Sequence, residues 1–239
     1  MRVEISVESV AGARVAAEAG AARVELCSAL SDGGLTPSAG LIEAAAEVIE
    51  VHALIRPRAG DFVYSRDEVD LIVRDIALAR RYGAAGVVVG ALTEDGAVDE
   101  VCAEFVAAAE GMQTTFHRAI DVTEDSRIAL DRLLALGFTR VLTSGRRRTA
   151  LDGAGLIKDL VAQAGADLEV MAGGGVRAAN AARVLAATGV RDLHAAPRVP
   201  VGVAFAGEVS YAGVGVPAGH DRFETDAAEV AALCAVRPG

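Results

Sequence analysis

Residues 22–38 read ARVELCSALSDGGLTPS, and this stretch contains one strand, one loop and the start of one helix. The apolar strand ends with Glu25 and Cys27, a glycine pair follows, and Thr36 and Pro37 predict a helix cap and a first-turn proline. A carboxylate and a thiol on one face of a buried strand are either packed side chains or parts of a site. The pattern of the remaining sequence is needed to distinguish these alternatives.

The same strand–loop–helix unit recurs along the chain. Apolar runs typical of strands alternate with amphipathic helical stretches, and no Pro/Gly-rich linker separates them. The predicted strands cover residues 3–7, 22–28, 51–57, 86–92, 112–118, 139–144, 168–173 and 191–196. This order favours a (β/α)8 TIM-type barrel over a doubly wound open sheet, which would require a GxGxxG motif after the first strand.

The barrel is predicted to span about residues 2–196 of a single domain, 1–239, with a C-terminal extension over about 197–239. The first part of the extension, 199–223, is rich in glycine and is expected to be irregular. The last part, 224–237, has the pattern of a final helix. An extension of this length is suited to cover a barrel end or a subunit interface.

The composition limits the partners of the chain. A length of 239 residues with 52% hydrophobic and 23% charged residues suits one barrel with a large core. The net charge of −10 argues against nucleic acid and against an anionic membrane surface, because both bind clustered Lys and Arg. No apolar run reaches the roughly 18 residues that cross a bilayer. The expected partner is therefore a small molecule or a metal ion.

The cysteines and the single lysine exclude some chemistry. Cys27, Cys102 and Cys234 lie far apart without CxxC spacing, which argues against a zinc site and, with no signal peptide, favours a reducing cytoplasm. Cys102 and Cys234 lie in helical patterns and are expected to pack in the core. Lys158 is the only lysine and lies within a predicted helix, which argues against a Schiff-base aldolase.

Strand alternation places a set of polar residues inside the barrel, close to the carboxyl ends of the strands where barrel enzymes carry their sites. Buried unpaired charges cost several kcal/mol each, so such a set must be paired or hydrated. It predicts a polar pocket. Its members at or just beyond the strand ends are Glu8, Glu25, Cys27, Arg56, Arg58, His117, Thr143 and His194, with Ser144 and the glycines 173–175 on the following loops.

Each polar group suggests a role. Carboxylates and imidazoles perform acid–base chemistry, which makes Glu8, Glu25, His117 and His194 the candidate catalytic residues. Arg56 and Arg58, held apart by a proline, are candidates for a clamp on a carboxylate or phosphate, and Ser144, Gly174 and Gly175 are candidate anion donors. Two structural alternatives remain open, namely an Arg56–Glu25 salt bridge and a hydrogen-bonded core position for His117.

Several stretches together resemble a known family. VELCSALSDGGLTPS, LIRPRAGDFVYS, TTFHRAIDVTED and VMAGGGV, with a histidine at the last strand, are similar to the CutC family, whose members are associated with copper homeostasis. The similarity runs in order from about residue 2 to the end of the eighth predicted strand. It implies a TIM-type barrel, a cytoplasmic location, a homodimer or larger homo-oligomer, and a role in copper homeostasis.

The resemblance also implies a metal site. The suggested copper(I) ligands of the family are cysteines at the ends of the first two strands, and soft thiolates suit Cu(I). Cys27 matches the second position, whereas Ser6 occupies the first. A site built from Cys27 with His117, His194 or Met171 is the remaining way to bind copper.

Two hypotheses therefore stand side by side. One is a CutC-like copper protein that uses Cys27. The other is a TIM-barrel enzyme that acts on a small polar or anionic substrate, sugar-like or phosphorylated, by Glu/His acid–base chemistry with arginine anion binding.

Overall fold

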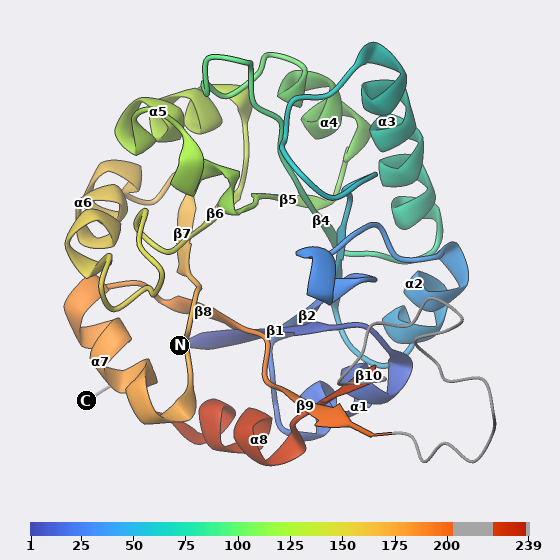
Figure 1. The fold of residues 1–239 in the computed structure, drawn as a ribbon, viewed down its shortest axis with the longest axis vertical. Helices are drawn as coiled ribbons and strands as arrows, with labels where there is room; N and C mark the ends of the chain where they lie inside the picture. Colours follow the sequence, from blue (N-terminus) through green and yellow to red (C-terminus); the bar gives the residue numbers. More distant parts are fainter. Residues whose placement is uncertain (203–221, 238–239) are drawn as a thin grey trace, which may run out of the picture.

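The computed structural model describes residues 1–202 and 222–237, and the predicted (β/α)8 barrel is confirmed (Figure 1). Neighbouring strands pair in parallel, and the last strand pairs with the first to close the barrel. The strands are β1 (Arg2–Val7), β2 (Arg23–Leu26), β3 (Val51–Leu54), β4 (Gly86–Val89), β5 (Gln113–Phe116), β6 (Arg140–Thr143), β7 (Glu169–Ala172) and β8 (Asp192–Ala195).

Helices surround the barrel, and side-chain caps begin several of them. They are α1 (Val10–Glu18), α2 (Ala39–Ala46), α3 (Arg66–Arg81), α4 (Cys102–Ala108), α5 (Ser126–Leu136), α6 (Ala154–Ala164), α7 (Ala178–Thr188) and α8 (Ala227–Ala235), with the 3-10 helices η1 (Leu30–Asp32) and η2 (Arg118–Val122). The prediction that Thr36 caps α2 was wrong, because Ser38 is the cap and the Thr36 hydroxyl pairs with the backbone of Arg56.

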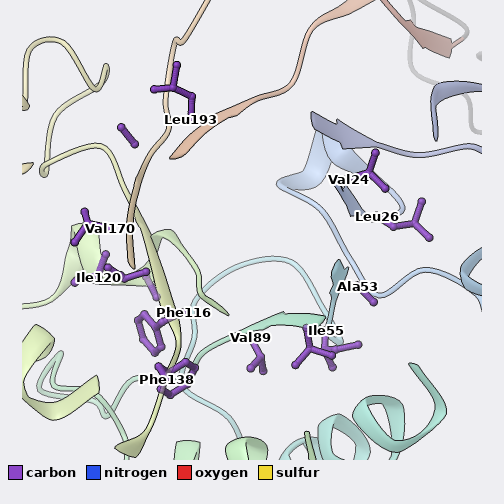
Figure 2. Packing of buried hydrophobic residues seen from close by; sticks show 14 of the residues in the cluster. Val24, Leu26, Ala53, Ile55, Val89, Phe116, Ile120, Phe138, Val170 and Leu193 are labelled. Atoms are coloured by element: carbon purple, nitrogen blue, oxygen red, sulfur yellow. The ribbon is translucent and has the colours of Figure 1, made fainter. Parts of the chain in front are cut away.

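The main hydrophobic core lies between the strands and the helices. Val24, Leu26, Ala53 and Ile55 belong to it, and Figure 2 shows these side chains together with those of other strands. Because successive strand residues point to opposite faces, the residues between them point into the barrel. Glu25 therefore faces the barrel interior, as the alternation in the sequence predicts.

The C-terminal extension begins with a strand. β9 (Arg198–Val201) pairs antiparallel with β10 (Arg222–Thr225), so the ends of the segment expected to be irregular form a two-stranded sheet. Residues 203–221 lie outside the described part of the chain. The expected final helix is α8, which packs between α7 and α1 (Figure 1). Within the described residues, no helix has the length and apolar character needed to cross a membrane.

Candidate functional site

Charged side chains fill the N-terminal half of the barrel interior. Arg23 Nε lies 2.6 Å from Glu4 Oε2, and Arg23 Nη2 lies 3.0 Å from Asp192 Oδ2. Arg140 Nε lies 3.4 Å from the same Asp192 oxygen, and Arg140 Nη1 donates to Thr115 Oγ1 on the neighbouring strand β5. We call Glu4, Arg23, Arg140 and Asp192 the charged layer. All four are buried, so their mutual pairing offsets the cost of removing them from water.

Sequence reasoning missed most of this layer. Alternation along the first strand predicts that Glu4 faces inward, whereas Arg23, Arg140 and Asp192 are not among the candidate residues selected from the sequence. Alternation with Glu25 would have placed Arg23 on the inner face, so the signal was available for that residue.

The next residues toward the carboxyl ends of the strands form the centre of the site. His194 Nδ1 lies 2.8 Å from Glu4 Oε1, and His194 Nε2 lies 3.8 Å from Glu25 Oε2. Glu25 is the register partner of Ser6, and Glu4 is the partner of Arg23, so Glu25 lies farther than Glu4 toward the carboxyl end. The imidazole of His194 therefore lies between a deep carboxylate and a shallower one.

The environment separates the two carboxylates chemically. Burial raises the pKa of Glu4, but the hydrogen bond from His194 and the charge of Arg23 outweigh it and hold that pKa far below its usual value. Burial raises the pKa of Glu25, and the charge of His194 opposes this only in part. For His194, burial lowers the pKa, but the charge of Glu25 and the bond to Glu4 raise it above the ordinary value.

His117 has a different environment. Its Nδ1 accepts the backbone N–H of Ala119 at 3.3 Å and so caps η2, while its Nε2 is buried without a partner among the described residues. Burial, followed by the positive charge of Arg56, lowers the pKa of His117 to about 3. The ring is therefore neutral at physiological pH. The alternative that His117 is a hydrogen-bonded core residue holds for its Nδ1 but not for its Nε2.

Arg56 binds backbone carbonyls. Its Nη1 donates to the carbonyl oxygens of Asp32 and Gly34, both at 3.1 Å, and its Nη2 donates to that of Gly60 at 2.8 Å. The loops after β2 and β3 are thereby held together. Among the described residues there is no ion pair between Arg56 and Glu25, so the expected structural salt bridge is absent there.

Arg58 binds different partners from Arg56. It pairs with Glu68 at 2.6 Å and Asp61 at 3.0 Å, and its side chain is 37% exposed. The two arginines therefore do not share a partner, because Arg56 binds carbonyl groups of the loops after β2 and β3 and Arg58 binds carboxylates near its own loop.

Glu8 and Ser144 are engaged in holding loops. Glu8 Oε1 accepts the N–H of Leu30 at 2.8 Å and anchors η1. The Ser144 hydroxyl is buried, accepts from Arg118 Nη2 at 2.7 Å and lies 3.0 Å from Asp121 Oδ2.

The prediction that Thr143 faces inward was wrong. Arg140 begins β6 on the inner face, so alternation places Leu142 inside, and the Thr143 hydroxyl instead donates to Asp121 Oδ1 at 2.6 Å. Gly174 and Gly175 lie on the loop after β7 with φ of +96° and +68°. A Cβ on Gly174 would lie 3.0 Å from the Ser144 Cβ, so this close approach requires glycine.

Cys27 lies in an apolar environment beside Leu54 and Val88. Its Sγ is 3.7 Å from Ser6 Oγ and 3.7 Å from the carbonyl oxygen of Val7. Burial, with a smaller contribution from the charge of Glu25, raises the pKa of the Cys27 thiol far above its usual value, so the thiol stays protonated.

These donors do not fit copper(I). A soft metal requires a thiolate and a second soft ligand, whereas the neighbour of Cys27 is the hard hydroxyl of Ser6. Met171 accepts a hydrogen bond from Arg23 at 3.4 Å and belongs with the charged layer. Within 1–202 and 222–237, no group of three or more His, Cys, Asp or Glu side chains is arranged to hold a metal ion.

A cleft of about 660 Å³ adjoins the site at the carboxyl end of β1. It is bounded by β1, α1 and the β9–β10 sheet, and Ser6 and Glu8 line it. Arg198, which sequence reasoning did not select, lines it as well, with its guanidinium 4.5 Å from the centroid of the Phe223 ring and a buried Nη1 without a hydrogen-bond partner among the described residues.

Comparison with known proteins identifies the family. The CutC family model matches residues 1–199. A CutC family protein from Pasteurella multocida is 45% identical over 197 residues, which cover 81% of each chain. A protein from Mus musculus with the name copper homeostasis protein cutC homolog is 47% identical over 199 residues, 82% of this chain and 73% of that one.

Solved structures agree with this match. The structure of a CutC protein from Streptococcus agalactiae has a TM-score of 0.77 and 35% identity, covering 81% of this chain and 97% of that chain. An aldolase, QR15, with a TM-score of 0.61 but 16% identity, covers 81% of this chain and 89% of its own, and shares the fold alone. With the closed barrel and the match over residues 1–199, this chain belongs to the CutC family.

Proposed function

We propose that this protein is an enzyme that moves protons on a small polar or anionic substrate, sugar-like or phosphorylated, at the carboxyl end of the barrel. The observation that carries the proposal is the imidazole of His194 between the carboxylates of Glu4 and Glu25. Glu4 stays ionised and orients the ring. Glu25, with its pKa raised by burial, is the group suited to take up and return a proton.

The surroundings support a small-molecule ligand. Ser6 lines the 660 Å³ cleft and pairs in register with Glu25, so the cleft adjoins the acid–base pair. Arg198 lines the same cleft, and its buried Nη1, which has no partner among the described residues, is a candidate donor to an anionic group. Arg198 thus takes the role that the sequence suggested for Arg58, and Gly174 and Gly175 remain candidate donors.

The test is a thermal-shift screen of sugars, sugar phosphates and small organic acids, followed by isotope exchange. Compounds that stabilise the protein are incubated with it in D2O, and deuterium entry into their C–H positions is followed by NMR. Glu25→Gln is expected to slow exchange about 100-fold or more, because the amide cannot accept the proton. Lys158→Ala, an exposed change on α6, serves as the control and leaves the rate unchanged. Equal exchange in wild type and Glu25→Gln would refute the proposal.

Copper homeostasis is the second candidate function, because the mouse and human relatives carry that name. It is tested by Cu(I) titration against a competing chelator. From the protonated, apolar environment of Cys27 we expect binding no tighter than about micromolar and no change in Cys27→Ala. Tight binding that Cys27→Ala abolishes would favour the copper function over the enzyme. We include a cytoplasmic location and a homo-oligomer in the proposal, because the CutC resemblance implies both.

A further inference from the structure

One buried nitrogen of His117 lacks a hydrogen-bond partner among the residues that the structure describes. Because Nδ1 accepts the N–H of Ala119, the proton of the neutral ring is on Nε2. His117 follows β5 on its inner face and is buried, and its Nδ1 edge is turned toward its own loop, so the Nε2 edge is turned away from that loop. Nε2–H is therefore a buried donor without an acceptor among the described residues.

The environment of His117 keeps its ring in one protonation state. Burial and the charge of Arg56 lower the pKa of His117 to about 3, so the ring remains neutral throughout the physiological range. A neutral ring with Nε2 protonated cannot accept a proton at that atom. His117 is thus suited to donate a hydrogen bond, and the acid–base role that the sequence suggested for it passes to Glu25 and His194.

Two other buried donors accompany His117. Arg56 uses both terminal nitrogens on carbonyl oxygens, and its side chain also interacts with the Tyr64 hydroxyl. Within residues 1–202 and 222–237, neither Arg56 Nε nor the Tyr64 hydroxyl has an acceptor for its hydrogen. The Arg56 Cζ and the His117 ring lie 5.2 Å and 4.6 Å from the centroid of the Phe62 ring, so both border the same aromatic side chain. We call His117, Arg56 and Tyr64 the donor cluster.

The chemistry of the donor cluster specifies its missing partner. Burial raises the pKa of Tyr64, so its hydroxyl keeps its proton and can donate. Arg56 has no carboxylate in an ion pair with it among the described residues, and the other two members carry no negative charge. Because an unpaired buried donor destabilises a protein, a cluster of them favours a ligand that brings acceptors.

We propose that the donor cluster binds a carbonyl or carboxylate oxygen of the substrate through His117 Nε2–H. The proposal rests on the proposed function, because it assigns to that substrate a polarised C=O group within the site served by Glu25 and His194. A neutral imidazole N–H in such a position stabilises charge on the oxygen without giving up its proton.

The experiment uses NMR of the full chain with 15N-labelled histidine, which has only four histidines to resolve. The probes are acetate for a carboxylate and acetamide for a neutral carbonyl. His117→Asn keeps an acceptor for the Ala119 N–H but has no group at the Nε2 position, whereas His117→Gln places an amide donor there. Comparing these two variants separates the effect of the Nε2 donor on binding from the effect of the helix cap at Ala119.

We expect a His117 signal of the Nε2–H tautomer that does not titrate between pH 5 and 8 and that shifts as one of the probes saturates. His117→Asn is expected to weaken binding of that probe about 10- to 100-fold, and His117→Gln is expected to restore part of it. The proposal is overturned by any one of three results: the other tautomer, no saturable shift with either probe, or equal binding by His117→Asn. Glu25→Gln should retain probe binding. Failure of the proposed function would therefore appear in the exchange assay, and failure of the donor-cluster proposal would appear in the probe titration.

Discussion

Replacing Arg23 with methionine tests the charged layer directly. Arg23 Nε and Nη2 form ion pairs of 2.6 Å with Glu4 and 3.0 Å with Asp192, and the three side chains are 3%, 0% and 0% exposed. Methionine fills a similar length without a charge, and it therefore leaves two buried carboxylates that have lost a shared cation.

The size of the effect follows from the partners that remain. Breaking a buried ion pair by removing one member costs about 3–5 kcal/mol. Asp192 keeps Arg2 at 2.6 Å and Arg140 at 3.4 Å, and Glu4 keeps His194 at 2.8 Å, which places the loss near the lower limit. We expect a loss of about 3 kcal/mol, equivalent to roughly 6–12 °C in Tm for a domain of this size.

Urea denaturation followed by circular dichroism at pH 7 measures the loss. The matched control is Arg127→Met, because Arg127 forms a 2.6 Å ion pair with Asp159 whose side chains are 57% and 52% exposed. An exposed pair is worth about 0–1 kcal/mol. If Arg23→Met loses no more than Arg127→Met, the reasoning that the charged layer is a mutually paired buried network is refuted.

Two further predictions concern protonation and reactivity. The raised pKa of His194 implies that the stabilisation by its charged form is complete below about pH 6.5 and is lost as the pH rises through the folded-state pKa. The difference in unfolding free energy between wild type and His194→Gln, measured by urea denaturation, should therefore shrink from pH 6 to pH 9. A difference that grows with pH would contradict the assignment. Burial raises the pKa of Cys102 to about 12 and that of Cys27 still further. Iodoacetamide at pH 8 should therefore label the half-buried Cys234 first in the folded protein and the other two cysteines only after unfolding, as peptide mass mapping can show. Early labelling of Cys27 would show an accessible thiolate and contradict this prediction.

The sequence was sufficient to predict the barrel because strand and helix patterns alternate without interruption. It also placed Glu25, His117 and His194 on inner faces, because the two-residue period of a strand needs no knowledge of its neighbours. The sixth strand shows the limit of this reasoning. Its inner face depends on which residue begins the ladder, and that residue is Arg140.

The pairing within the site could not be read from the sequence. Glu25 contacts His194 because β2 and β8 both flank β1 once the barrel closes, and a linear pattern does not give the relative heights of residues on different strands. Arg56 donates to the carbonyl groups of residues 32, 34 and 60, which are loop acceptors that a strand pattern in the sequence does not reveal. Local loop geometry decided the partners of the longest side chains.

The charged layer has a consequence for molecular traffic. Its contacts join β1, β2, β6 and β8, and Arg140 reaches Thr115 on β5 and lies 3.5 Å from His52 on β3, so ion pairs and hydrogen bonds block the bore at its amino-terminal end. The barrel interior is therefore closed at the amino-terminal end of the strands. Any small molecule that binds inside the barrel must therefore enter and leave at the carboxyl end of the strands.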